Sequence, residues 1–329
     1  MPVLIDILWL VAGLVALYFG AEWLVGASAK LAVRLGISPL VVGLTVVAFG
    51  TSSPELFVSY QFNFEGLADM AVGNVIGSNI CNIGLILGIS ALLYGLAVKA
   101  ELLRRDMPIL LLTTGVFVWM IWDRQLGRGE GIVLAVGVIA YTVYCIWESK
   151  REKNPEVLKE FEEEFGAKDQ VESEPLWKLL GLILIGLVAL YFGAEWLKKG
   201  GVNLAERLGV PSSVISLTLV AFATSVPELA TSVVAAMKRE GDIIIGNVVG
   251  SCIFNLLCVM GFTALAKPMV IAEISVVDLA VMGAFTVAML PMMLTRQKIG
   301  RAEGAILLLG YGAYVVFLYF DRIAPATGA

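Results

Sequence analysis

The sequence contains no histidine. Histidine is a common proton shuttle near neutral pH, a frequent transition-metal ligand and the general base of many hydrolases. Charged residues are also scarce, at 16% of the chain, where an average soluble domain has about 25%. Nothing resembles the basic face that a nucleic-acid partner would need. These absences argue against most hydrolases, against nucleic-acid binding and against a soluble fold.

Cysteine is rare too, with only four residues: Cys81, Cys145, Cys252 and Cys258. They lie in apolar segments without metal-type spacing, so we expect small buried residues rather than ligands. An intramembrane hydrolase would need a Ser–His pair, a GxGD motif or His-rich ligands, and none occurs. No segment resembles the filter loop of a passive channel. We therefore expect neither an enzyme nor a channel, and no cofactor.

Apolar residues are abundant, at 59% of the chain with a mean hydropathy of +0.88. Long apolar stretches recur from end to end, which is typical of a polytopic helical membrane protein in contact with the lipid bilayer. The first stretch carries Glu22 and Trp23 and lacks a small-residue cleavage site, so we expect a retained helix rather than a signal peptide. The sequence predicts ten membrane helices, near residues 4–25, 38–62, 69–97, 107–122, 130–147, 176–197, 211–237, 243–266, 274–294 and 303–320.

The chain also contains an internal repeat. When it is shifted by 173 residues, residues 13–24 fall on 186–197 without a mismatch. Residues 13–82 align with 186–255 without a gap, and 37 of 70 pairs are identical. Each copy spans five predicted helices, and because five is odd the second copy enters the membrane from the opposite side. The sequence thus predicts an all-α polytopic membrane protein with two inverted five-helix repeats, an architecture of secondary transporters.

These features divide the chain into three parts. We expect a first repeat over 1–147, an acidic cytosolic linker over 148–175 and a second repeat over 176–329. The linker is rich in Glu and Lys and is expected to be a solvated charge run, with a regulatory calcium site as the less favoured interpretation. Lys and Arg are more frequent in the short loops on one side. By the positive-inside rule this bias places both termini outside the cell membrane.

Two short motifs place a carboxylate deep in an apolar segment. They are Gly50-Thr51-Ser52-Ser53-Pro54-Glu55 and Ala223-Thr224-Ser225-Val226-Pro227-Glu228. An ionisable group at membrane depth is by default a functional-site hypothesis. Pro54 has no N–H, so it deprives the carbonyl of Gly50 of its helical partner, bends the helix and loosens carbonyls near Ala48. One turn thus offers a carboxylate, two hydroxyls and carbonyls, which are hard ligands suited to Na⁺ and Ca²⁺.

The third and eighth predicted helices supply matching oxygens. Ser78 and Asn82 are four residues apart, so they share a helix face, and Ser251 and Asn255 repeat the pattern. Over both copies these motifs hold two carboxylates, six hydroxyls and two amides. A calcium ion takes six to eight oxygens, and two ionised glutamates would neutralise one Ca²⁺. The open alternative is that the hydroxyls and amides only join helices and that the prolines are ordinary kinks.

The paired motifs closely resemble the two signature repeats of the cation/calcium exchanger superfamily. They are most similar to Na⁺/Ca²⁺ exchangers, including compact prokaryotic members, over essentially the whole chain. The resemblance implies helices 2, 3, 7 and 8 packed around the ions, with helices 1 and 6 sliding against them. It also implies a sodium/calcium antiporter that exchanges one Ca²⁺, usually against three Na⁺, by electrogenic alternating access. We expect a monomer.

The resemblance also implies a ligand set. The side chains would come from Glu55, Glu228, Thr51, Ser52, Ser78, Thr224, Ser225 and Ser251, and the carbonyls from Ala48 and Ala221. Asn82 and Asn255 complete the candidate metal site as amide oxygens.

Two departures from the family pattern stand out. Ala223 replaces the glycine that Gly50 represents in the first copy, and we expect its methyl group to alter local bending. Asn255 stands where some relatives, including K⁺-dependent ones, have an aspartate, which argues against K⁺ cotransport. The alternative function is a H⁺/Ca²⁺ antiporter, since a glutamate can release Ca²⁺ on protonation. Against it, the proton-coupled branch usually has a second acid where this chain has Ser78 and Ser251.

Overall fold

The structure is a computed structural model that describes residues 2–35, 39–151, 174–207, 221–295 and 297–323. These residues are almost entirely helical. The first half contains α1 (Pro2–Leu35), α2 (Pro39–Val42), α3 (Ala48–Thr51), α4 (Ser53–Phe64), α5 (Ala68–Cys81), α6 (Gly88–Tyr94), α7 (Met107–Met120) and α8 (Arg128–Arg151). The second half contains α11 (Leu176–Arg207), α13 (Ala221–Thr224), α14 (Val226–Met237), α15 (Gly241–Phe254), α16 (Met260–Ala266), α17 (Val276–Leu294) and α18 (Arg301–Leu318).

Short π-helical turns adjoin several of these helices. Gly43–Val47 joins α2 to α3, Asn82–Leu87 joins α5 to α6, and Asn255–Val259 joins α15 to α16. Leu102–Asp106 precedes α7, and Tyr319–Ile323 follows α18. Two of them begin at equivalent positions of the repeat, Asn82 and Asn255. π-Helical turns inside α-helices are rare and frequently lie at functional sites.

Seven of the described helices are long and apolar enough to cross a membrane. The pair Leu40–Thr51 and Ser53–Phe64 makes an eighth span, bent by 42°. Val226–Met237 is a shorter apolar helix. Residues 211–220 of the predicted seventh helix and residues 152–173 of the predicted linker lie outside the described part of the chain. The chain is therefore a multi-pass helical membrane protein, whereas the predicted count of ten remains a prediction.

The first and sixth predicted helices were placed too short at their C-terminal ends. α1 continues from the expected residue 25 to Leu35, and α11 from 197 to Arg207. The sequence becomes less uniformly apolar there, which suggested an end. The helix continues in α1 because Ala27, Leu31 and Ala32 are buried against neighbouring helices, and tertiary packing outweighs the local polarity.

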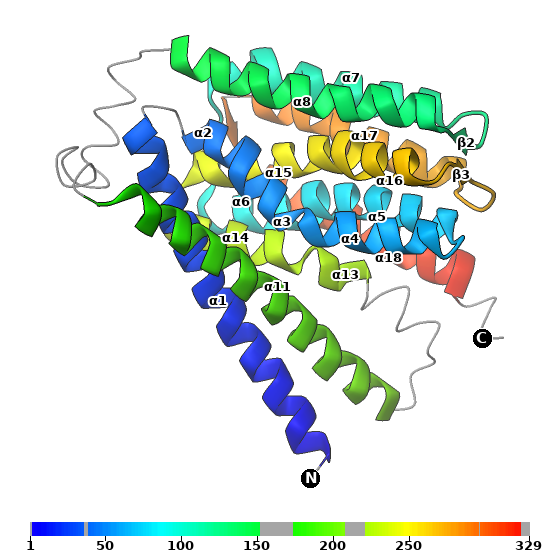
Figure 1. The fold of residues 1–329 in the computed structure, drawn as a ribbon, viewed down its shortest axis with the longest axis horizontal. Helices are drawn as coiled ribbons and strands as arrows, with labels where there is room; N and C mark the ends of the chain where they lie inside the picture. Colours follow the sequence, from blue (N-terminus) through cyan, green and yellow to red (C-terminus); the bar gives the residue numbers. More distant parts are fainter. Residues whose placement is uncertain (1, 36–38, 152–173, 208–220, 296, 324–329) are drawn as a thin grey trace.

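α1 and α11 lie side by side and slant across the remaining helices (Figure 1). Glycines allow the close approach: a Cβ on Gly13 would lie 2.8 Å from the carbonyl oxygen of Gly193, and one on Gly20 2.9 Å from that of Gly186. Such small-residue contacts are typical of helix pairs in membranes.

Ionic contacts hold both ends of this antiparallel pair. Near one end, Arg207 donates to the buried Asp6 at 2.6 Å. At the other, Lys30 and Arg34 hold Glu174, and the hydrogen bond from Lys30 lowers the pKa of Glu174 below its ordinary value. α1 and α11 are thus tied along their length.

The centre of the bundle is formed by α5–α6 and α15–α16. The most apolar stretch of Gly241–Ala266 is completely buried, and that of Ala68–Tyr94 is 78% buried. The corresponding stretches of α17 and α18 are only 28% and 11% buried and present apolar side chains outward. The two buried spans are equivalent in the repeat, so each repeat contributes one span to the core.

Two pairs of very short strands tie loops of the two halves together. β1 (Leu96–Ala97) pairs antiparallel with β4 (Lys298–Ile299), and β2 (Gln125–Leu126) with β3 (Met269–Val270). α7 separates β1 from β2 along the chain, and α17 separates β3 from β4. Since α7 and α17 pack together, the two strand pairs lie at opposite ends of these helices.

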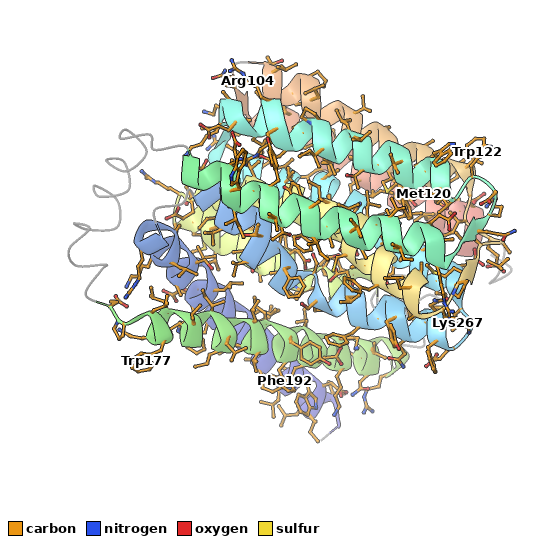
Figure 2. The ribbon with its side chains drawn as sticks, turned by 45° about the horizontal axis from the view of Figure 1, so that its top comes forward. Arg104, Met120, Trp122, Trp177, Phe192 and Lys267 are labelled. Atoms are coloured by element: carbon orange, nitrogen blue, oxygen red, sulfur yellow. The ribbon has the colours of Figure 1, made fainter. Side chains whose placement is uncertain are left out.

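Basic and aromatic side chains lie near the ends of the bundle. Figure 2 shows Arg104 near one end and Trp122 with Lys267 near the other. Trp122 and Trp177 are largely exposed, and exposed tryptophans beside helix ends are typical of membrane–water interfaces.

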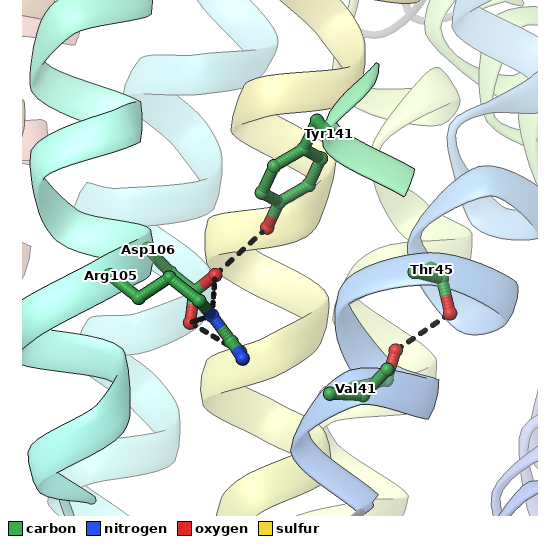
Figure 3. A network of polar contacts seen from close by, with 5 residues as sticks. All are labelled: Val41, Thr45, Arg105, Asp106 and Tyr141. Atoms are coloured by element: carbon green, nitrogen blue, oxygen red, sulfur yellow. Dashed lines mark hydrogen bonds and ion pairs between the residues drawn. The ribbon is translucent and has the colours of Figure 1, made fainter. Parts of the chain in front are cut away.

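A buried polar network fixes the start of α7 against α8. Asp106 is fully buried and accepts bonds of 2.9–3.1 Å from Arg105 and one of 3.3 Å from the Tyr141 hydroxyl (Figure 3). Arg105 balances the buried carboxylate of Asp106, and this pairing lets a charge lie beside the apolar core. The same view shows a separate contact, in which Thr45 donates to the carbonyl of Val41 at 2.6 Å.

Candidate functional site

The candidate site begins where two helices break. Ser52 separates α3 from α4 with φ −83° and ψ 3°, and Ser225 separates α13 from α14 with φ −88° and ψ 2°. In each case the proline lies within the first two residues of the following helix, where a missing N–H is tolerated. The predicted bend is confirmed in the first copy. The dihedrals of Ser52 and Ser225 match, but Ser52 donates its N–H to the carbonyl four residues back and Ser225 to the carbonyl three residues back. The effect of the Ala223 methyl group on bending remains a prediction.

The two glutamates lie directly after these breaks. Glu55 on α4 is 0% exposed and Glu228 on α14 is 1% exposed. Ser52 donates to Oε1 of Glu228 at 3.0 Å, and Ser225 donates to Oε1 of Glu55 at 3.3 Å. Each carboxylate is therefore bound by the serine of the other repeat. These contacts bring the two acids together in the interior rather than toward lipid.

The third and eighth predicted helices, α5 and α15, complete the arrangement. Ser78 on α5 lies 3.4 Å from Oε1 of Glu55 and 3.2 Å from the hydroxyl of Ser225. On α15, Asn247 lies 3.2 Å from the Thr51 hydroxyl, and Ser251 and Asn255 follow on the same face at spacings of four residues. The contacts of the carboxylates therefore involve Ser52, Ser78 and Ser225, and the other predicted side chains lie on the same or adjoining helix segments or on α15 and the turn after it. We call the ten predicted side chains the oxygen cluster: Thr51, Ser52, Glu55, Ser78, Asn82, Thr224, Ser225, Glu228, Ser251 and Asn255.

Several atoms of the oxygen cluster are buried without a hydrogen-bond partner. Among the described residues these include Oε2 of Glu55, Oε2 of Glu228, Oγ of Ser251, and Oδ1 of Asn82 and of Asn255. A buried polar atom left unpaired costs on the order of 1–3 kcal/mol. Five such oxygens in one cluster therefore point to a ligand that accepts electron pairs, which is what a cation does.

The two predicted backbone ligands are less clearly arranged. The carbonyl of Ala48 accepts the N–H of Ser52 at 3.0 Å, so the proline downstream does not deprive it of its helical partner. The Thr51 hydroxyl also lies 3.4 Å from this carbonyl oxygen, so a cation bound there would replace that contact. Ala221 begins α13, and the N–H four residues later, that of Ser225, donates to the carbonyl of Phe222 at 3.1 Å instead of to that of Ala221.

Sequence reasoning gave no role to two further amides beside the oxygen cluster. Asn74 on α5 and Asn247 on α15 are buried and contact the threonines of the break segments. The signal that could have identified them is their identity in both copies of the repeat at the same register as Ser78 and Ser251. Asn79 also lies beside the cluster, since it accepts the amide N–H of Asn255 at 3.0 Å, but its equivalent in the second copy is Cys252, so the repeat does not single it out.

The chemistry of the cluster favours an alkali or alkaline-earth cation. All its donors are carboxylate, hydroxyl or amide oxygens, the ligands that Na⁺ and Ca²⁺ prefer. No group of three or more His, Cys, Asp or Glu side chains suited to a metal occurs in the part of the chain that the structure describes. All four cysteines are buried and free, as expected. Two carboxylates with neutral oxygens suit weak, exchangeable binding.

Comparison with known proteins agrees with this chemistry. The family model described as sodium/calcium exchanger protein matches residues 5–147 and 178–320. The chain is 36% identical to the putative antiporter CaxA of Alkalimonas amylolytica, over 96% of this chain and 99% of that protein. It is 32% identical to the sodium/calcium exchanger MaX1 of Methanosarcina acetivorans, again over 96% and 99% of the two chains.

A solved structure is similar over the same length. The sodium–calcium exchanger NCX_Mj, soaked with Na⁺ and Sr²⁺, superposes with a TM-score of 0.83 at 29% identity. The match covers 95% of this chain and 98% of that one. The resemblance therefore extends beyond the two motifs to nearly all of the fold.

Proposed function

Because this chain belongs to the sodium/calcium exchanger protein family, we propose that it is an antiporter that exchanges one Ca²⁺ against three Na⁺ by alternating access. The observation that carries the proposal is the pair of buried glutamates, each bound by a serine of the other repeat and each with an unpaired Oε2. Two carboxylates would neutralise one Ca²⁺. Three Na⁺ leaving for one Ca²⁺ entering would move one net positive charge outward, so exchange would be electrogenic.

The proposed ligands are the ten side chains of the oxygen cluster, together with the carbonyls of Ala48 and Ala221. Na⁺ and Ca²⁺ would compete for overlapping oxygens, so that loading with one expels the other. Na⁺ carries half the charge of Ca²⁺, so each Na⁺ ion would need fewer carboxylate contacts than one Ca²⁺ ion does. Hydroxyl and amide oxygens would then supply the remaining coordination as several Na⁺ ions replace one Ca²⁺.

The architecture proposed for this function is ten membrane helices in two inverted repeats, over 1–147 and 176–329, with a cytosolic linker over 148–175 and both termini outside. The tie between α1 and α11 supports their movement as one unit across the oxygen cluster. Sliding of this unit would open the cluster to one side of the membrane at a time. A monomer contains both repeats and would suffice for the cycle.

The test is transport by the purified full-length protein in sealed proteoliposomes. Vesicles loaded with Na⁺ and diluted into Na⁺-free medium should accumulate radioactive Ca²⁺, faster when the interior is held positive. Glu55→Gln or Glu228→Gln should abolish this uptake, because one carboxylate cannot balance a dehydrated divalent ion. The matched control is Glu65→Gln, which removes an exposed carboxylate just after α4 and should leave uptake unchanged.

The alternative is exchange against protons, because a buried carboxylate can also be neutralised by a proton. Uptake that follows a pH gradient and ignores the Na⁺ gradient would establish the alternative and reject Na⁺ coupling. Uptake that ignores both gradients would reject antiport altogether.

A further inference from the structure

Asn74 and Asn247 occupy equivalent positions of the repeat, 173 residues apart, and neither belongs to the oxygen cluster. Both side chains are buried. Each lies four residues before a serine of the cluster on its own helix, so its amide faces the same way as Ser78 or Ser251. An amide at such a position must find partners for both its oxygen and its nitrogen.

The partners of Asn74 form a chain of three hydrogen bonds. The Thr224 hydroxyl lies 3.4 Å from Oδ1 of Asn74, and Nδ2 of Asn74 donates to the Ser59 hydroxyl at 3.0 Å. Ser59 in turn donates to the carbonyl of Ala71 at 3.3 Å. The chain thus begins in the second repeat at Thr224 and ends on the backbone of the first.

The partners of Asn247 repeat this pattern with the halves exchanged. The Thr51 hydroxyl lies 3.2 Å from Oδ1 of Asn247, and Nδ2 of Asn247 donates to the Ser232 hydroxyl at 3.2 Å. Ser59 and Ser232 are also 173 residues apart. The contacts of the amide with a threonine and a serine therefore occur twice, from different segments of the chain.

The direction of the first chain follows from its end. A backbone carbonyl has no hydrogen, so the Ser59 hydroxyl must donate to it and can only accept from Asn74. The amide nitrogen of Asn74 then faces Ser59 and the amide oxygen faces Thr224. Since that oxygen can only accept, the Thr224 hydroxyl is the donor in this contact, and Glu55 is a second acceptor for it.

A hydroxyl binds a cation through its lone pairs, so its hydrogen must point elsewhere. We propose that Asn74 and Asn247 are positioning residues for cation binding, each of which takes the hydroxyl hydrogen of the other repeat's threonine and so turns the threonine lone pairs toward the oxygen cluster. This inference rests on the proposed function, since it assigns Thr224 and Thr51 as cation ligands. It explains why each asparagine contacts the opposite repeat and why a serine holds its nitrogen.

The two copies need not contribute equally. The Thr51 hydroxyl also lies 3.1 Å from the carbonyl of Val47 and 3.4 Å from that of Ala48. A hydroxyl has one hydrogen, so Asn247 shares it with two backbone carbonyls. The Thr224 hydroxyl likewise has two acceptors, Asn74 and Glu55. The test is made on the chain through Asn74, because its end on the carbonyl of Ala71 fixes the orientation of the amide.

The experiment measures equilibrium Ca²⁺ binding to the detergent-purified full chain by titration calorimetry. Asn74→Ala and Thr224→Val should each weaken binding by about five- to tenfold, the loss of one hydrogen bond or ligand. The double variant should bind no more weakly than Thr224→Val alone, because the asparagine acts only through the threonine. In transport, Asn74→Ala should raise the KM for Ca²⁺ and keep most of the maximal rate.

A second pair of variants keeps the proposal testable if Asn74→Ala does not fold. Ser59→Ala should weaken Ca²⁺ binding in the same direction, and Ser59→Thr should restore it because the hydroxyl remains. The matched control is Asn63→Ala on α4. Asn63 is also buried, at 2% exposure, but its amide donates to the carbonyls of Thr263 and Lys267, so Ca²⁺ binding should not change.

Three results would overturn the proposal: wild-type affinity in Asn74→Ala, losses that multiply in the double variant, or an equal loss in Asn63→Ala. Ca²⁺ binding that shows the expected pattern without Na⁺-driven uptake would reject the proposed exchange but leave this inference standing. Na⁺-driven uptake with unchanged affinity in Asn74→Ala would reject only the inference.

Discussion

Two neighbouring serines on one helix turn have different environments in this protein. Ser52 is buried and donates to Glu228 of the other repeat, whereas Ser53 donates back to the carbonyl of Phe49 on the preceding helix, α3. The second repeat keeps the first serine as Ser225 but has Val226 in place of the second. Identity within the repeat therefore follows contact with the carboxylates.

This contrast yields a prediction at the residue scale. Ser52→Ala should lower the apparent Ca²⁺ affinity about five- to tenfold, because it removes one ligand oxygen and one hydrogen bond to Glu228. Ser53→Ala on the same turn should leave affinity unchanged, since its hydroxyl serves only the helix backbone. The dependence of uptake rate on Ca²⁺ concentration measures both. Equal losses in the two variants would contradict the assignment of Ser52 to the cluster.

Gly50 has a role that its local sequence did not reveal. A Cβ at this position would lie 2.3 Å from Cδ2 of Leu187 on α11. The glycine therefore makes room for a side chain of the slanted helix. This packing against α11 is a role of Gly50 beside the difference in bending that we expect at Ala223.

At the scale of helices, the important feature is the contact between α1 and α11. A Cβ on Gly186 would lie 2.8 Å from the carbonyl oxygen of Gly20. A Cβ on Gly181, on the same helix, would meet no atom of another helix within 4 Å among the described residues. One glycine of α11 thus lies in a tight helix contact and the other does not.

Gly186→Val should push the two helices apart and lower the free energy of unfolding by about 1–3 kcal/mol, the usual effect of overpacking. Gly181→Val should have little effect, because its side chain has space. Thermal unfolding in detergent, followed by size-exclusion chromatography, measures both. If Gly186→Val is as stable as the wild type and transports normally, α1 and α11 do not need this close contact.

At the scale of the whole molecule, the two halves are related by inversion only if equivalent residues lie on opposite sides of the membrane. Glu65 and Lys238 are equivalent under the 173-residue shift and are both exposed in short connections between helices. The strand pairs fit this arrangement, since β1 and its equivalent β3 belong to separate sheets at opposite ends of α7 and α17.

The inverted architecture predicts that a cysteine at position 65 reacts with a membrane-impermeant maleimide from outside intact cells. A cysteine at position 238 should react only after the cells are permeabilised. The four native cysteines are buried, so the wild-type protein serves as a low-background control. Reaction of both positions from the same side would reject the inverted repeats.

The sequence by itself was enough to identify a polytopic membrane protein and the two acids at its centre. An acid in an apolar segment is costly to bury, and finding it at the same register of two copies left little room for chance. The repeat also located the hydroxyls and amides of the oxygen cluster, because helical spacing determines which residues share a face. The bend before Glu55 followed from the chemistry of Pro54.

The tertiary structure decided which oxygens meet. Ser52 and Glu55 are three residues apart, so their own turn would allow them to pair, yet each serine binds the glutamate of the other repeat. The contacts of Asn74 with Thr224 and of Asn247 with Thr51 also join segments at least 150 residues apart. Sequence spacing fixes the faces of single helices, but only the packing of helices against one another determines which faces come into contact.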